Sequence, residues 1–92
     1  PAVYTASPVL TEIAVYPNPN KGPFTIELDA EQPQQYEISI LDLMGRQILH
    51  EKQEGIKGFN QWEFDSSSFT EGVYTMRIQT VNEMRTIKFV VD

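Results

Sequence analysis

Short runs of alternating apolar and polar residues, each bounded by turn residues, are the feature that most constrains how this chain can fold. The clearest run, FTIELDA at residues 24–30, carries apolar side chains at every second position and polar side chains between them. Successive side chains of an extended strand point to opposite faces, so this order separates an apolar face from a polar one. The run is therefore predicted to form a half-buried β-strand.

Six further runs of similar length occur along the chain, and turn residues separate all of them. The seven runs cover residues 12–16, 24–30, 36–43, 46–53, 59–66, 72–80 and 84–91. Since no interval holds a helix of about 10–15 residues, antiparallel sheets are favoured over alternating strands and helices. Two sheets packed face to face would bury every apolar stripe. We therefore predict an all-β fold, an immunoglobulin-like antiparallel β-sandwich of about seven strands.

Most aromatic residues fall on the inward faces of these runs. Tyr36, Tyr74 and Trp62 stand at apolar positions of the alternation, so core packing is their expected use. The segment DSSSFTEG at residues 65–72 is the one place where a short helical turn is expected, with a serine cap and Phe69 turned inward.

Composition excludes several classes of function. The formal net charge of −6 argues against a nucleic-acid partner, because phosphate binding needs clustered Lys and Arg. No cysteine is present, so the chain has neither a disulfide nor a thiolate metal site. No apolar run approaches the roughly 20 residues that a membrane-spanning helix needs. No cofactor motif and no acidic loop of EF-hand spacing is found.

Residues 1–11, PAVYTASPVLT, are small, polar and punctuated by proline, which is typical of a linker or a loosely ordered lead-in. We place a domain boundary near Thr11 and assign residues 12–92 to the β-sandwich. Because the sequence starts at Pro1 without an initiator methionine, we expect it to be a fragment or processed product of a longer protein.

The segment VYPNPNKGPF predicts a rigid corner between two strands. Pro17 and Pro19 have no amide hydrogen to offer a sheet and hold their predecessors extended, so the first strand ends here. Asn18 and Asn20 can bond their own backbone in turns, and Gly22 can take a positive φ where the chain enters the next strand.

Two later segments are predicted to shape the ends of strands. In LDLMGRQI, Asp42, Gly45 and Arg46 lie between two strands and indicate a hairpin turn with Gly45 in the left-handed conformation. In EGVY, Gly72 starts a strand, and Tyr74 can cap the core with a buried ring and a bonded hydroxyl.

Four motifs together resemble a known family. VYPNP followed by GPFTI, DLMGR between two strands, GVYTMRI, and a lysine in a final apolar strand are similar to the type A C-terminal sorting domain of the type IX secretion system, described from Bacteroidetes. The resemblance covers residues 13–92, and the order and spacing of the motifs make it far more specific than any one motif. The motif positions are Pro17, Asn18, Pro19, Gly22, Asp42, Gly45, Arg46, Gly72, Tyr74 and Lys88.

The resemblance implies a non-catalytic cargo tag with a seven-stranded immunoglobulin-like fold and no cofactor. The cargo would precede the domain covalently, enter the periplasm by an ordinary N-terminal signal, and cross the outer membrane through the type IX translocon. Translocon and shuttle components would recognise the domain. A sortase-like surface protease would usually remove it while joining the cargo to an anionic lipopolysaccharide, which leaves the cargo at the cell surface or secreted.

The motif residues are expected to divide into structural and recognition roles. Gly22, Gly45 and Gly72 lie at turns, where backbone conformation would explain them. Lys88 differs, because a lysine between two apolar residues of a strand points outward. An exposed edge there could offer its backbone to a translocon component by strand addition.

Other classes of function stay open beside the sorting domain. An accessory carbohydrate-binding or spacer module would use aromatic residues as a sugar platform, drawn from Tyr4, Tyr16, Tyr36, Tyr74 and Trp62, although core packing is favoured for the last three. A homo-oligomerising sandwich would assemble through its edges. An enzyme is disfavoured, because His50 is the only histidine and has no partner for a nucleophile relay. No G-x-S-x-G elbow surrounds the serines at residues 66–68.

Overall fold

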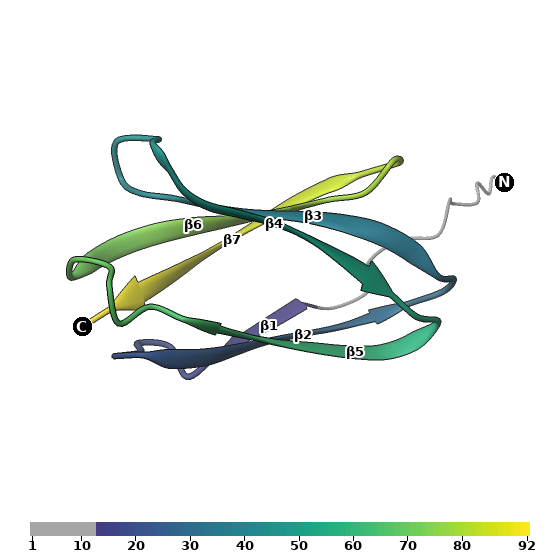
Figure 1. Cartoon of the computed structure of the whole chain (residues 1–92), viewed down its shortest axis with the longest axis horizontal. Helices are drawn as coiled ribbons and strands as arrows, with labels where there is room; N and C mark the ends of the chain where they lie inside the picture. Colours follow the sequence, from purple (N-terminus) through teal and green to yellow (C-terminus); the bar gives the residue numbers. More distant parts are fainter. Residues whose placement is uncertain (1–12) are drawn as a thin grey trace, which may run out of the picture.

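Two antiparallel sheets packed face to face make up the structure, a computed structural model that describes residues 13–92 (Figure 1). The strands of this part are β1 (Ile13–Tyr16), β2 (Pro23–Ala30), β3 (Gln34–Leu41), β4 (Gln47–Gly55), β5 (Gly58–Asp65), β6 (Gly72–Gln79) and β7 (Met84–Val91). The prediction of an all-β fold is confirmed. The expected lead-in at residues 1–11 and its boundary near Thr11 lie outside the described residues.

The strands are ordered β1-β2-β5 in a three-stranded sheet and β4-β3-β6-β7 in a four-stranded sheet. Every pair of neighbours is antiparallel, which gives the immunoglobulin-like sandwich that the sequence predicted. β3 ends at Leu41, two residues earlier than expected, because the carboxylate of Asp42 begins a turn there. Residues 13–92 hold no helix that is long and apolar enough to cross a bilayer.

The core lies between the two sheets, where the apolar face of each long strand is buried. In β2, Phe24, Ile26 and Leu28 are at most 2% exposed, as their alternation predicted. Burial of one such side chain contributes about 1.5–3 kcal/mol. Trp62 is half buried and packs against the core from β5. The buried apolar residues are Phe24, Ile26, Leu28, Ala30, Tyr36, Ile38, Ile40, Phe64, Tyr74, Met76, Ile78, Phe89 and Val91.

Aromatic contacts join the two sheets across this core. The ring of Phe24 in β2 packs on that of Phe89 in β7 with their centroids 5.2 Å apart. The ring of Tyr36 in β3 packs on that of Trp62 in β5 at 5.3 Å. Such pairs add about 0.5–1.5 kcal/mol beyond the area that they bury.

The strands are antiparallel to their neighbours and are joined by short connections. Three of these connections lie at the same end of the sandwich, on the left in Figure 1. We call this end the corner end. It consists of residues 17–22 between β1 and β2, residues 42–46 between β3 and β4, residues 66–71 between β5 and β6, and Asp92 after β7. The other three connections lie at the opposite end.

Residues 66–71 connect β5 to β6 through a tight turn and form no helix, so the helical turn expected at residues 65–72 is wrong. The amide of Phe69 donates to the carbonyl of Ser66 at 2.9 Å, and the chain then enters β6. The carboxylate of Asp65 accepts from the amide of Ser67 at 2.9 Å, so an aspartate rather than a serine caps this turn. The hydroxyl of Ser66 bonds elsewhere, as described below. Phe69 does turn inward and packs against the core.

Gly55, at the end of β4, leaves room for the ring of Tyr36, which is fully buried. A Cβ atom on Gly55 would lie 2.2 Å from a ring carbon of Tyr36, far inside van der Waals contact. At Gly22, by comparison, the nearest atom to an added Cβ is 3.8 Å away.

Gly55→Ala is expected to lower the free energy of unfolding by about 1–3 kcal/mol, because the buried ring of Tyr36 must move. Gly22→Ala is the matched control and should unfold at nearly the same urea concentration as the wild type. Urea denaturation followed by the fluorescence of Trp62 measures both variants. Equal midpoints for Gly55→Ala and its control would contradict the packing described above.

Candidate recognition surface

Residues 17–20 dock onto the outer edge of β7, the last strand of the four-stranded sheet. The amide of Asn20 donates to the carbonyl of Val90 at 2.9 Å, and the amide of Asp92 donates to the carbonyl of Asn20 at 2.8 Å. The side-chain oxygen of Asn18 accepts from the amide of Val90, also at 2.9 Å. The corner therefore pairs part of an edge that would otherwise be open.

The prediction that both asparagines bond their own backbone holds for one of them. The side-chain amide of Asn20 donates to the carbonyl of Pro17 at 3.4 Å. Asn18 instead bonds to a strand 72 residues further along the chain, which no local pattern indicates. The peptide bonds that precede Pro17 and Pro19 are both cis.

Ser66 ties the corner to the end of β5. Its hydroxyl lies within hydrogen-bond distance of the side-chain oxygen of Asn20 and 3.1 Å from the carbonyl of Gly22, to which its amide also donates at 2.9 Å. Ser66 is 1% exposed and Asn20 2%, so these bonds satisfy groups that would be costly to bury unpaired. The sequence predicted only a serine cap in this segment and missed this role of Ser66. One signal was present, because Ser66 continues the inward alternation of Trp62 and Phe64.

Gly22 does not have the positive φ that the sequence predicted. Among residues 13–92, positive φ occurs at Gly45, Gly58 and Gly72. The carbonyl of Gly22 accepts from Ser66, a contact that any residue can make, and an added Cβ would have no neighbour closer than 3.8 Å. The prediction that backbone conformation explains Gly22 is therefore wrong.

One carboxylate holds the turn at residues 42–46. Oδ1 of Asp42 accepts from the amides of Met44 and Arg46, each at 2.9 Å, and Oδ2 accepts from Nε of Arg46 at 2.8 Å. The backbone of Asp42 accepts from the amide of Gly45 at 3.0 Å and donates to the carbonyl of Arg46 at 2.9 Å. Gly45 has a φ of 86°, so the predicted left-handed conformation is confirmed.

These bonds favour the ionised form of Asp42. The backbone amide of Arg46 is the largest cause, and the guanidinium of the same residue adds to it, so the pKa of the Asp42 carboxyl lies below its ordinary value of 3.8. Partial burial of the side chain, which is 13% exposed, opposes this effect without cancelling it.

Tyr74 caps the core at the corner end, as the sequence predicted. It is 4% exposed, and its ring packs on those of Phe89 and Phe69 with centroid distances of 5.9 and 5.2 Å. Its hydroxyl donates to the carbonyl of Thr70 at 2.5 Å. Gly72 begins β6 two residues earlier, with a φ of 154°.

A cleft of about 390 Å³ opens between the turn at residues 42–46 and the connection that precedes β6. Its lining includes Asp42, Arg46, Ile48, Phe69, Thr70 and Tyr74. Two of the sequence motifs, DLMGR and GVYTMRI, therefore border the same hollow.

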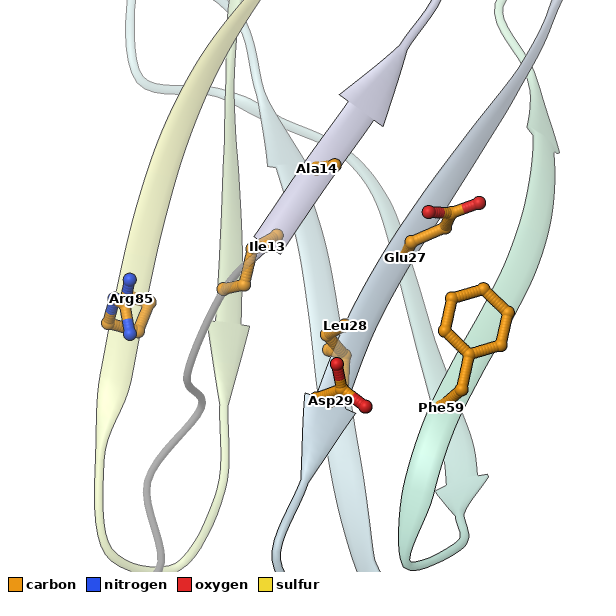
Figure 2. A pocket seen from close by; sticks show the side chains of 7 residues that line it. All are labelled: Ile13, Ala14, Glu27, Leu28, Asp29, Phe59 and Arg85. Atoms are coloured by element: carbon orange, nitrogen blue, oxygen red, sulfur yellow. The ribbon is translucent and has the colours of Figure 1, made fainter.

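A second cleft, of about 410 Å³, lies where β1 begins, away from the corner end (Figure 2). β1 pairs with residues 25–28 of β2, so it does not reach Asp29 and Ala30 at the end of β2 beside this cleft. No motif position lines this cleft. Its lining residues are Ile13, Ala14, Glu27, Leu28, Asp29, Phe59 and Arg85.

Lys88 is exposed on the outer face of β7, opposite Thr75 in β6, in the outward orientation that was expected. Alternate residues of a strand direct their backbone groups to the same edge, so Thr86 and Lys88 share the edge at which Val90 meets the corner. No described residue pairs with the edge at Thr86 and Lys88.

The sequence motifs, far apart along the chain, thus come together in space. All the motif positions except Lys88 lie at or beside the corner end, and Lys88 lies two residues before Val90, where the corner docks. The arrangement offers a rigid surface built from several segments.

The residues considered for other functions are placed differently. Nε2 of His50 lies 3.2 Å from Oε1 of Glu37 on an open sheet surface. Among residues 13–92, no three His, Cys, Asp or Glu side chains are grouped so that they could hold a metal ion. Tyr36 and Tyr74 are buried and Trp62 is half buried, so they serve the core rather than a sugar platform.

Comparison with known families gives a match to the secretion system C-terminal sorting domain over residues 14–92. The chain therefore belongs to the family of type IX secretion C-terminal sorting domains, and the resemblance found in the sequence is confirmed. Membership implies an interaction with the type IX machinery and export to the cell surface or the medium.

Comparisons with individual proteins add little to the family match. No curated protein sequence matches the chain. Among solved structures, the chain is similar to a β-glucosidase from Listeria innocua in complex with glucose, at 14% sequence identity and a TM-score of 0.48. That match covers 91% of this chain and 16% of the β-glucosidase chain.

Ser66→Ala is expected to lower the free energy of unfolding by about 1–3 kcal/mol, because Asn20 and Gly22 would lose a buried donor. Ser67→Ala is the matched control, since Ser67 is the next residue and is exposed. Urea denaturation measures both variants. If the two variants unfold alike, Ser66 does not hold the corner in place.

The contribution of Asp42 to stability should depend on pH in a defined direction. Its pKa is lowered in the folded state, so the unfolded state binds more protons, and stability is lost as the pH falls from 3.8 through the lowered value. Asp42→Asn should remove this part of the pH dependence while keeping an oxygen for the amides. Urea unfolding of both proteins between about pH 2 and pH 6 tests this, and parallel pH profiles would contradict it.

Proposed function

We propose that residues 12–92 act as a non-catalytic secretion signal that directs a covalently preceding cargo protein across the outer membrane through the type IX system. The observation that carries this proposal is the family match over residues 14–92. The cargo would pass through the periplasm and reach the cell surface or the medium. Cleavage by a sortase-like protease and surface attachment would usually follow, with residues 1–11 as the linker.

The corner end is the recognition surface in this proposal, and translocon and shuttle components are its partners. Its support is that distant motifs meet there: Asn18 bonds to β7, while Asp42 and Tyr74 border one cleft. A receptor that covers this end contacts several parts of the chain at once. Because these parts are adjacent only after folding, the surface distinguishes the folded domain from an unfolded chain.

The motif residues contribute in two ways. Gly45, Gly72 and Tyr74 keep the corner end in shape, since conformation or packing explains each of them. Gly22 is buried, and its carbonyl accepts from the amide of Ser66, so its contribution is to the backbone of the corner. Lys88 presents an exposed ammonium group beside an edge that a partner strand can extend.

The position of His50, the single histidine of the chain, supports a non-catalytic role. It lies against Glu37 on an exposed sheet surface and lines neither of the two clefts described above. A general base needs a substrate site within hydrogen-bond reach, and neither cleft offers one to His50.

The proposal is tested by export of a periplasm-targeted fluorescent protein fused to residues 1–92. The fusion is expressed in a type IX-competent bacterium and in its translocon-deficient counterpart. We expect fluorescence at the surface or in the medium of the competent strain alone. A folded fusion that stays in the periplasm of both strains would overturn the proposed function.

Lys88→Ala is expected to reduce this export by about tenfold, the effect of losing about 1.4 kcal/mol of binding free energy. Lys52→Ala is the matched control, because Lys52 is also exposed, on β4 of the same sheet. Urea denaturation of the purified domains shows whether both variants fold. Undiminished export of Lys88→Ala would remove Lys88 from the recognition surface.

A further inference from the structure

Two apolar side chains protrude from the turn between β3 and β4. Leu43 is 78% exposed and Met44 is 81% exposed. Turn positions ordinarily carry Gly, Pro, Asn, Asp or Ser, each for a conformational reason that Leu and Met do not supply. The fold therefore gains little burial and no turn conformation from this pair.

The turn holds the backbone of the pair in a fixed conformation. The carboxylate of Asp42 accepts from the amides of Met44 and Arg46 at 2.9 Å and from Nε of Arg46 at 2.8 Å. These bonds fix the backbone around the pair before any partner arrives, which lowers the conformational entropy lost on binding. An exposed apolar pair on a rigid backbone turn is suited to filling a pocket at the centre of an interface.

The cleft beside the turn continues this surface. It shares Asp42 and Arg46 with the turn and extends to Ile48, which is 42% exposed, and to Phe69 and Tyr74. A partner that covers the tip would lie over the cleft as well. The protruding Leu43 and Met44 and the adjacent cleft together form one surface that carries both apolar and charged groups.

We propose that Leu43 and Met44 form an apolar anchor that inserts into an apolar pocket on a protein of the type IX machinery. This inference rests on the proposed function and names the part of the corner end that carries the contact. Asp42, Gly45 and Arg46 position the anchor. The unbranched side chain of Met44 lets the anchor adapt to the shape of the pocket.

A protein pocket fits this tip better than a lipid surface does. The net charge of −6 opposes approach to an anionic membrane. Interfacial binding to lipid grows with the apolar area that is buried, and two side chains keep that area small.

A second copy of this chain offers a poorer pocket as well. The cleft beside β1 is lined in part by Glu27, Asp29 and Arg85, and the cleft at the corner end by Asp42 and Arg46. Burying an apolar anchor against these groups would remove water from charged side chains, which is unfavourable. A different protein with an apolar cavity is therefore the expected partner.

The test uses the fluorescent fusion to residues 1–92 with two sets of substitutions. Leu43→Ser combined with Met44→Ser removes the apolar pair and keeps the Asp42 carboxylate. Val81→Ser is the matched control, because Val81 is 92% exposed and lies between β6 and β7 at the opposite end. Urea denaturation should show that all of these variants are as stable as the wild type, since the altered side chains are exposed.

Crosslinking identifies what the tip touches. A photo-reactive amino acid is placed at position 44, and at position 81 as the control, in a type IX-competent strain. We expect a discrete protein adduct from position 44 and none from position 81. We also expect the double variant to reduce translocon-dependent export by roughly tenfold or more, as the loss of a hot spot does, and Val81→Ser to leave it unchanged.

Different results overturn the anchor and the proposed function. Undiminished export by the double variant overturns the anchor and leaves the proposed function standing. Adducts with lipid alone, with a second copy alone, or with nothing at position 44 also overturn the anchor, whichever way export responds. A wild-type fusion that is not exported overturns the proposed function, and the anchor falls with it.

Discussion

The buried hydrogen bonds around Asn20 are the constraint on which the rest of the structure depends. β1 has only four residues and pairs with β2 alone among the described strands, so the edge of the three-stranded sheet has few contacts of its own. Asn20 bonds through its backbone to the end of β7 and through its side chain to Ser66, which connects both sheets. Separating these segments would leave buried donors and acceptors without partners. The apolar core brings the sheets together, and this polar cluster fixes how their ends meet.

The proposed recognition surface follows from the same arrangement. Antiparallel pairing brings alternate connections to one end, and the polar cluster holds the corner against β7 there. Beneath the surface, the rings of Tyr74 and Phe89 close the core. Above it, the carboxylate of Asp42 holds a rigid turn that projects Leu43 and Met44 outward. The residues that stabilise this end of the domain and those of the proposed recognition surface are therefore neighbouring but different.

The sequence predicted those features whose physical causes are local. Alternation revealed the strands because each long strand buries one face, and the turn around Gly45 was predictable because its bonds span four residues at most. The roles of Asn18 and Ser66 were missed because their partners lie 72 and 46 residues away. Glycine permits a positive φ without requiring it, so the sequence could not show that Gly22 lacks one. Leu43 was assigned to a strand because the run YEISILDL was extended to its last apolar residue, and only the bonds of Asp42 show that the chain turns before it.

The bond between Asn18 and Val90 has a consequence for the order of folding. Closing a loop of 72 residues costs chain entropy, so this contact forms after shorter-range pairings have brought the ends near each other. During synthesis the corner emerges long before β7, and an incomplete chain leaves the corner without the strand that it covers. The closed corner therefore forms only when the final strand is present and paired. Its presence distinguishes a completely folded domain from an incomplete one.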